Sequence, residues 1–514
     1  MIDNSSSRRE IKKSTEEKST KKFDNKVFKY LRIFERDELI AVRRFIISPY
    51  FNESEAVINL FQHVRRFHDG GYTSHRLKSE VVFSHLFPDE AYNHRKLINL
   101  YSDLAVLLEK YIAVNELESD AMTKRKVLMD AYGKRRQFEF FEKEIEKGMK
   151  IVNKDNTKNI FYYQDRIFLN TVMYQYPLIE QFKKDSERLP NLLKDLNEYY
   201  YLMKLRYTAY YLNDAVTFRG FEEEKSLLDE LNLMQKLVDT SDNQLIIFYA
   251  KLINLLKTPF QIDNFQEVID FFIKNIYLFS HEELRAAYLV LLNIITGAYN
   301  KTNRFAWQLF ELRKMGLEEK WVVRNNTITD ITFNNTIIAG CLCGEFEQLA
   351  GLLPLGQKYL PPQIRQDVLF LAKANIEHYQ KRYIQSLTVL SKIEKTTLTI
   401  DFKSRVLRVK NLIHLLQKGD DSADYYGEIV QHATLGIKFL QRDKTRSKIL
   451  NNKGVLFFKI SKQIAITIRN KSLTLTRHKA QLEAKRIQKI KTRIAENNIL
   501  SQKWLLAQLA LVKN

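Results

Sequence analysis

The sequence predicts an all-α protein, in particular an α-solenoid of stacked antiparallel helix pairs that ends in a basic helical segment. Glycine and proline are scarce, at 15 and 8 of 514 residues, whereas hairpins and phosphate-binding loops need glycine. Hydrophobic residues make up 45% of the chain, which is enough for a large core. Apolar residues also recur at helical spacing from residue 31 almost to the end.

The N-terminal region is expected to consist of a tail and a group of helices. Residues 1–30 are polar and rich in Lys, Glu and Ser, which predicts a flexible tail. Residues 31–118 follow as an N-terminal helical region. There, Asn52 with Glu55 three residues later is typical of a helix start, and Asn93 is expected to cap a long amphipathic helix.

The helix pair within residues 75–112 is similar to that of winged-helix DNA-binding regulators. Arg95, Lys96 and Asn99 lie on the early turns of its second helix, where recognition helices contact bases. A wing would need a β-hairpin after this pair, but residues 124–132 read as another helix. The sequence therefore disfavours DNA reading by this pair.

Residues 119–440 are expected to form a helical-repeat body. The clearest units span about 337–353 and 371–390, each with a helix, a tight turn and a second helix. The aromatic residues that open second helices are Phe305, Phe346 and Tyr383. With small residues in the first helix and this aromatic spacing, the units resemble tetratricopeptide repeats, whose period is about 34 residues. The resemblance implies a scaffold of stacked helix pairs and supplies no ligand.

Three further segments resemble an uncharacterised bacterial helical-repeat family. They are Ser-Pro-Tyr-Phe-Asn at 48–52, the stretch 86–104, and Lys-Trp-Leu-Leu at 503–506. This resemblance implies one continuous architecture from residue 31 to the end, without an activity.

Residues 441–514 are expected to form basic C-terminal helices. From Gly436 onward 19 Lys and Arg face three acids, so +16 of the net charge of +21 lies there. The basic line predicted to contact a polyanion is Lys485, Arg486, Lys489 and Arg493. Three interpretations stay open, namely a solvated helix face, a nucleic-acid phosphate site, and a site for an acidic protein or an anionic lipid surface. The last helix, around Trp504, is apolar enough to dock onto the body.

A cluster of tyrosines within residues 199–211 is the candidate partner-binding surface of the body. Tyr200, Tyr207 and Tyr211 share one helix face, with Arg206 beside them. Tyr and Arg are frequent anchors of binding surfaces. The alternative is that this face packs against the next helix, with each tyrosine acting as a bulky core residue.

The sequence contains no pattern that predicts a catalytic, cofactor-binding or metal site. Phosphate-binding loops, the dinucleotide fingerprint, the nucleophile elbow and the zinc-protease motif are all absent. Five histidines (His63, His68, His75, His85 and His94) lie in the N-terminal region, but their spacing does not converge on a metal. Cys341 and Cys343 read as small core residues, in a number that fits a reducing compartment.

These observations favour a cytoplasmic, non-enzymatic scaffold or adaptor that binds a protein or peptide partner through a helical-repeat groove. The N-terminus lacks a secretory signal, and the apolar runs are too short to span a bilayer. The alternative is a nucleic-acid-associated, regulatory protein that binds phosphates through its basic C-terminal helices. An enzyme whose site is scattered along the groove is the third hypothesis.

Overall fold

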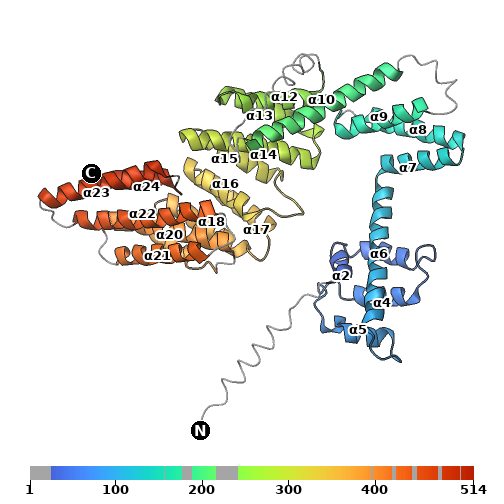
Figure 1. The fold of residues 1–514 in the computed structure, drawn as a ribbon, viewed down its shortest axis with the longest axis horizontal. Coiled ribbons are helices and arrows are strands. Elements are labelled where there is room, and N and C mark those ends of the chain that lie inside the picture. The colour runs from blue at the N-terminus through green and yellow to red at the C-terminus, as the bar shows by residue number, and fades with distance from the viewer. Residues whose placement is uncertain are drawn as a thin grey trace, which may run out of the picture. The chain divides into compact units, whose positions relative to one another are not determined.

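The computed structural model describes residues 25–155, 157–175, 188–215, 241–394, 397–419, 424–442, 448–472, 477–497 and 499–513. These residues form helices and turns, and no β-strand occurs among them. Most of these helices pack against a neighbour in chain order (Figure 1). The all-α prediction is therefore confirmed for the described residues. Two compact units are distinguished, unit 1 with Met1–Asn156 and Gln164–Leu193, and unit 2 with Thr157–Tyr163 and Lys194–Asn514.

Unit 1 is built around the long helix α6 (His94–Ser119), which is surrounded by the shorter helices that precede it (Figure 1). Leu97, Leu104 and Leu108 lie on its buried face. The Asn93 side chain accepts a hydrogen bond from the Lys96 backbone N–H at 3.0 Å, so the predicted cap is confirmed. The other helices that lie wholly within unit 1 are α2 (Lys26–Leu31), α3 (Glu38–Ile46), α4 (Glu55–Arg65), η1 (His75–Leu77), α5 (Ser79–Leu86), α7 (Ala121–Lys134) and α8 (Phe138–Lys154).

The first described helix begins before the expected boundary at residue 30. Lys26–Leu31 is helix α2, whose Val27, Phe28 and Leu31 are buried in the core of unit 1. These three apolar residues have helical spacing, but they are too few to be recognised beside a long polar segment. Residues 1–24 of the predicted tail lie outside the described residues.

The predicted cap at Asn52 was wrong by two residues. Ser54 precedes α4, and its hydroxyl accepts a hydrogen bond from the Val57 N–H at 3.4 Å. Asn52 instead donates its side-chain amide to the Ile46 carbonyl at 3.0 Å and thereby closes the turn after α3. Both residue types cap helices well, so local sequence does not decide between them.

Unit 2 contains the predicted helix pairs. The expected unit at 337–353 is α16 (Asp330–Cys343) followed by α17 (Phe346–Tyr359), with Gly344 between them in the left-handed conformation at φ +80°. The expected unit at 371–390 is α18 (Arg365–Tyr379) and α19 (Tyr383–Leu390). Further helices of this unit are α12 (Gln244–Lys257), α13 (Ile262–Lys274), η3 (Ile276–Leu278), α14 (His281–Thr302) and α15 (Ala306–Glu318).

Close approach of neighbouring helices in this region depends on glycine. A Cβ atom at Gly340 on α16 would lie 2.6 Å from the Leu349 side chain on α17 and 2.7 Å from Phe310 on α15. Gly340 therefore permits α16 to pack tightly between its two neighbours.

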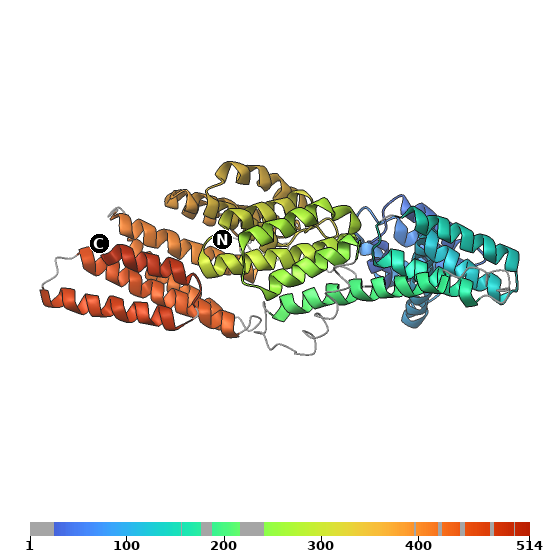
Figure 2. The same cartoon turned by 90° about the horizontal axis from the view of Figure 1, so that it is seen from above.

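The C-terminal helices of unit 2 share one hydrophobic core, which runs across the expected domain boundary at residue 440. They are α20 (Leu398–Lys418), α21 (Tyr425–Arg442), α22 (Lys448–Ser472), α23 (Arg477–Glu496) and α24 (Gln502–Lys513). Buried side chains from all five helices contact one another, with Leu412, Ile429, Phe458, Ile490 and Leu505 among them. Helices α20, α21 and α22 lie side by side (orange to red in Figure 2). The increase in positive charge after residue 440 therefore affects only the surface, because the helices on both sides of this position share one core.

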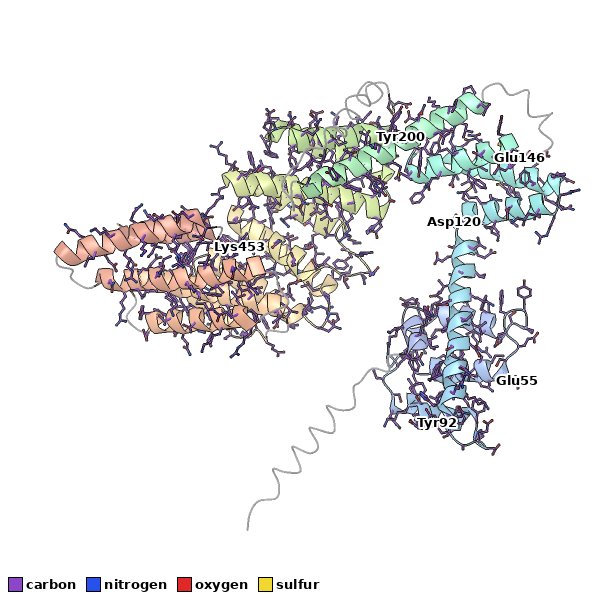
Figure 3. The ribbon with its side chains drawn as sticks, viewed as in Figure 1. Glu55, Tyr92, Asp120, Glu146, Tyr200 and Lys453 are labelled. Carbon is purple, nitrogen blue, oxygen red and sulfur yellow. The ribbon has the colours of Figure 1, made fainter. Side chains whose placement is uncertain are left out.

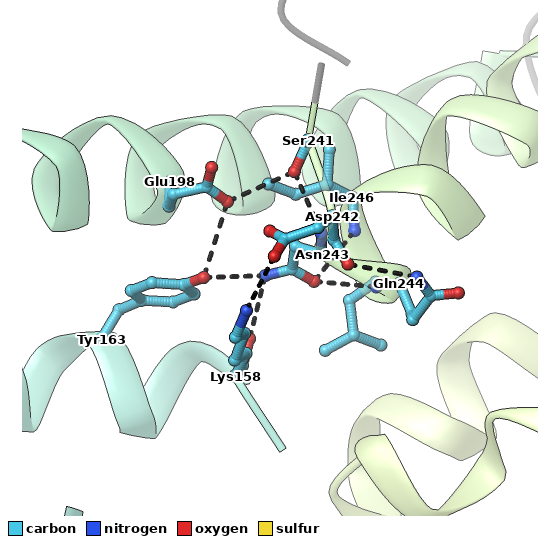
Figure 4. Close-up of polar contacts among 9 residues, drawn as sticks. Lys158, Tyr163, Glu198, Ser241, Asp242, Asn243, Gln244 and Ile246 are labelled. Atoms are coloured by element: carbon cyan, nitrogen blue, oxygen red, sulfur yellow. Dashed lines mark hydrogen bonds and ion pairs between the residues drawn. The ribbon is translucent and has the colours of Figure 1, made fainter. Parts of the chain in front are cut away.

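A buried polar network joins three segments at the beginning of unit 2 (Figure 4). The Asn243 side-chain oxygen accepts a hydrogen bond from Leu245 N–H at 2.9 Å and so caps α12. Its amide donates to the Tyr163 hydroxyl at 3.0 Å and to the Lys158 carbonyl at 3.1 Å. The Tyr163 hydroxyl lies 3.5 Å from Glu198 on α10 (Arg188–Asp214). One amide thus connects the start of α9 (Ile160–Gln175), α10 and α12.

Replacing Asn243 by alanine is expected to lower the free energy of unfolding by about 2–4 kcal/mol. The loss combines a helix cap with buried partners that are left unpaired, because Asn243 is only 1% exposed. Urea unfolding at pH 7 measures the change. The matched control is Asn264→Ala on an exposed turn of α13 (Ile262–Lys274), and an equal effect of the two substitutions would contradict this account.

Candidate functional site

A cavity of about 700 Å³ lies in unit 2, where α18, α19 and α20 meet the last helix, α24. Its volume falls within the range of about 300–1,000 Å³ that is typical of ligand sites. The residues that carry its chemistry are Lys381, Lys410, Lys503, Tyr383, His414 and Trp504. No Asp or Glu occurs among the described residues that line it. We call this cavity the lysine–aromatic pocket.

Helix α20 forms one wall of the pocket with residues that lie next to its buried face. Val409, Leu412 and Ile413 are fully buried in the core. Lys410 and His414 are one helical turn apart, so they project together beside that core. The His414 ring stacks on Tyr383, the first residue of α19, with centroids 4.6 Å apart and planes within 5°.

Helix α24 forms the opposite wall, and its predicted docking onto the body is confirmed. Leu505 and Leu509 are fully buried against the C-terminal core. The Trp504 indole N–H donates to His414 Nε2 at 3.3 Å. The Lys503 ammonium donates to the Asn300 carbonyl at the end of α14, at 2.8 Å. These contacts fix the beginning of α24 over the pocket.

Two histidines of the pocket are held in the neutral form. His378 Nδ1 lies 2.6 Å from the Asn411 side-chain oxygen, and the Asn411 amide donates to the Ser386 hydroxyl at 2.8 Å. The hydroxyl in turn donates to the Ala374 carbonyl at 2.7 Å, so Nδ1 of His378 carries the proton. Burial lowers the pKa of both His378 and His414 to about 4.

Lys410 contributes a positive charge to the pocket that no described carboxylate offsets. Its ammonium lies 5.2 Å from the centre of the Trp504 ring, and within the described part of the chain no hydrogen bond or opposite charge offsets its loss of solvent. Burial lowers the pKa of Lys410 to about 8. The Gln508 side chain lies in the same wall and is 3% exposed, yet its carbonyl oxygen has no hydrogen-bond partner among the described residues. The pocket therefore presents positive charge, aromatic faces and an unused acceptor.

The predicted tyrosine surface lies on α10, far from this pocket in the sequence. Its tyrosines are exposed, but its arginine is not. Tyr200, Tyr207 and Tyr211 are 48%, 56% and 43% exposed, so the alternative of a face buried against the next helix was wrong (Figure 3 labels Tyr200). Arg206 does not accompany them outward. Its guanidinium lies 3.7 Å from the buried carboxylate of Glu283, because its position on the helix faces the core.

The predicted basic line lies on α23. Lys485 and Lys489 are exposed, one turn apart, whereas Arg486 and Arg493 are partly buried. Arg486 also pairs with Glu483 at 3.6 Å. Ile487, Ile490 and Ile494 bury the opposite face. The described helix therefore offers two outward lysines rather than four equivalent cations.

Other candidate residues take structural positions. Lys96, in the helix pair considered for DNA reading, pairs with Glu90 at 2.7 Å and lies over the Phe87 ring. Cys341 is buried, and burial raises the pKa of its thiol to about 12. Within the described ranges, no group of three or more His, Cys, Asp or Glu side chains is arranged to hold a metal ion.

Local sequence patterns do not reveal the lysine–aromatic pocket. Its side chains are contributed by segments between Tyr299 and Gln508, which only the tertiary fold brings together. One local signal was present, since Lys410 and His414 interrupt the apolar stretch 406–416 at i, i+4 spacing. A charged residue on an otherwise apolar helix face is a reason to expect a site there.

Comparisons with known proteins add no assignment. The sequence matches no protein-family model, and no curated protein and no solved structure matches it. Among the described helices, none is both long and apolar enough to cross a bilayer.

Proposed function

We propose that this chain is a non-enzymatic scaffold, built as an α-solenoid of tetratricopeptide-like helix pairs, that binds an acidic peptide segment of a partner protein in the lysine–aromatic pocket. The observation that carries the proposal is the composition of the pocket wall. Three lysines and several aromatic rings line it, with no carboxylate among the described lining residues.

An acidic peptide matches each chemical feature of this wall. Carboxylates of the peptide would neutralise the ammonium groups of Lys381, Lys410 and Lys503. Apolar or aromatic side chains would cover the Trp504 ring. Backbone N–H groups would satisfy the unpaired oxygen of Gln508. Helical-repeat proteins commonly bind partners on their concave surfaces, and acidic motifs are commonly recognised by clusters of cationic side chains.

Reversing one pocket charge by Lys381→Glu is expected to weaken acidic-peptide binding about tenfold, because one close attraction becomes a repulsion. The probe is a fluorescein-labelled Glu-Glu-Tyr-Glu-Glu-Leu peptide, measured by anisotropy at 50 mM and 200 mM salt. The same peptide with Gln in place of Glu tests the charge requirement. Lys373→Glu on the exposed side of α18 is the matched control. Absence of saturable binding, or equal losses in the two variants, would overturn the proposal.

A second candidate function is binding of nucleic-acid phosphates through α23. The observation in its favour is the pair of outward lysines, Lys485 and Lys489. Binding of this kind weakens steeply as salt increases. We expect the double substitution Lys485→Glu and Lys489→Glu to abolish a gel shift of 30-nucleotide RNA or DNA at 50 mM salt. If the unaltered protein gives no shift under these conditions, this candidate is eliminated.

A further inference from the structure

We propose that Lys410 is an acylation site, modified by small acyl phosphates that enter the lysine–aromatic pocket. The proposal rests on three features of the pocket, which are an amine without a carboxylate partner, an open cavity that reaches it, and neighbouring cations that attract a phosphate.

The first feature is the environment of the amine. The titratable groups that line the cavity together with Lys410 are tyrosines, histidines and lysines, namely Tyr299 on α14, His378 and Tyr379 on α18, Lys381 before α19, Tyr383 on α19, His414 on α20 and Lys503 on α24. None of them is acidic, and the two histidines are neutral near pH 7 because burial lowers their pKa to about 4. An exposed lysine is protonated at this pH, whereas burial brings the pKa of Lys410 to about 8. About a tenth of its amine is therefore neutral and nucleophilic at pH 7, and about half at pH 8.

The second feature is access. Lys410 lines a cavity of about 700 Å³, in which an acetyl phosphate molecule fits easily. Its ammonium is directed at the face of Trp504 rather than into an ion pair. The amine can thus turn toward a bound molecule without first breaking a salt bridge.

The third feature is recognition of the leaving group. Lys381 and Lys503 line the same cavity and supply positive charge for a phosphate. The amine nitrogen of Lys410 forms a bond to the acyl carbon, and the bond from that carbon to the phosphate oxygen breaks. The electron pair leaves with inorganic phosphate, which also takes the proton from the nitrogen. The product is a neutral amide.

The consequence for binding rests on the proposed function. Acylation removes the Lys410 charge, and we expect it to weaken acidic-peptide binding about tenfold. A modification driven by the acyl phosphate concentration would then regulate the scaffold.

The test uses the full chain, incubated with acetyl phosphate and analysed by peptide mass spectrometry. The initial rate at Lys410 is compared with that at Lys373, an exposed lysine of α18. We expect Lys410 to react about tenfold faster at pH 8, since its larger neutral fraction outweighs its lower intrinsic nucleophilicity. Its rate should level off near pH 8, whereas an ordinary lysine continues to gain until about pH 10.5. Inorganic phosphate at 10 mM should slow Lys410 at least twofold and leave Lys373 unchanged.

Equal rates at the two lysines, or equal protection by phosphate, would overturn the acylation proposal. The labelled acidic peptide is titrated into the same preparation, which separates the two proposals. A fast Lys410 without peptide binding overturns the scaffold function alone. Peptide binding with Lys410 no faster than Lys373 overturns the acylation site alone.

Discussion

Replacing Lys410 by methionine is expected to stabilise the protein by on the order of 2–3 kcal/mol at pH 7. The Lys410 side chain is half-buried beside Trp504 without a carboxylate partner among the described residues, and this loss of solvent lowers its pKa from 10.5 to about 8. Methionine keeps the aliphatic contacts beside Trp504 and removes the buried charge. An inactivating substitution that stabilises the fold is typical of residues kept for function.

The stabilisation by Lys410→Met is expected to decrease as the pH rises. Between about pH 8 and pH 10.5 the unfolded chain holds a proton on Lys410 that the folded chain lacks, so stability rises with pH in this window. The unfavourable contribution of Lys410 is fully present below pH 8 and is gone above pH 10.5. Urea unfolding of the methionine variant should therefore show the largest gain at pH 7 and almost none at pH 10.5. A gain that Lys373→Met reproduces, or one that does not change with pH, would contradict the buried-charge account.

Acidification is expected to destabilise unit 2 by on the order of 3 kcal/mol or more between pH 6.5 and pH 4. Burial lowers the pKa of His378 and His414 to about 4. The unfolded chain takes up these protons near pH 6.5, whereas the folded chain resists them until about pH 4, so stability falls as the pH falls through this window. Protonation of His414 would also remove the acceptor of the Trp504 N–H.

The substitution His378→Gln isolates one half of this effect. Glutamine can still donate a hydrogen bond to Asn411 but does not titrate. Chemical unfolding at pH 7, 6, 5 and 4 should show about half of the acid-induced loss for this variant. His281→Gln at the exposed start of α14 is the control and should leave the pH profile unchanged. If His378→Gln also leaves the profile unchanged, the buried histidines are not the cause of the acid sensitivity.

The sequence predicted the helices well because their signals are local. The apolar line on α6 and the Asn93 cap depend on residues within a few turns of each other. The same holds for the helix pairs α16–α17 and α18–α19, with Gly344 at the first turn. The predicted tail boundary was wrong because Val27, Phe28 and Leu31 form a short apolar set that starts a helix within the polar segment. The predicted Asn52 cap was wrong because Ser54, two residues later, caps the helix instead.

Side-chain direction was harder to predict than helix position. Tyr200, Tyr207 and Tyr211 share a face, as their spacing indicates, but only tertiary contacts decide that this face is exposed. The same contacts turn Arg206 toward Glu283. On α23 Arg486 forms an ion pair with Glu483, three residues earlier. A prediction based only on the positions of the basic residues does not include this pair.

The pocket lay beyond local reasoning for a related reason. Trp504 lies 90 residues from its hydrogen-bond partner His414, and Lys503 lies 203 residues from Asn300. Such pairs arise from docking of α24. The apolar residues Leu505 and Leu509 predict that this helix docks, but they do not predict which residues of the body it contacts. The docking contributes the wall that turns a lysine on an apolar helix into a binding site.

Hydrogen–deuterium exchange with and without the Glu-Glu-Tyr-Glu-Glu-Leu peptide tests the central proposal most directly, because it distinguishes the three candidate surfaces. The proposal predicts that the peptide slows exchange in 299–303, 378–383 and 499–508, the segments that surround the pocket. Protection confined to α10 around Tyr200–Tyr211, or to α23 around Lys485 and Lys489, would contradict it.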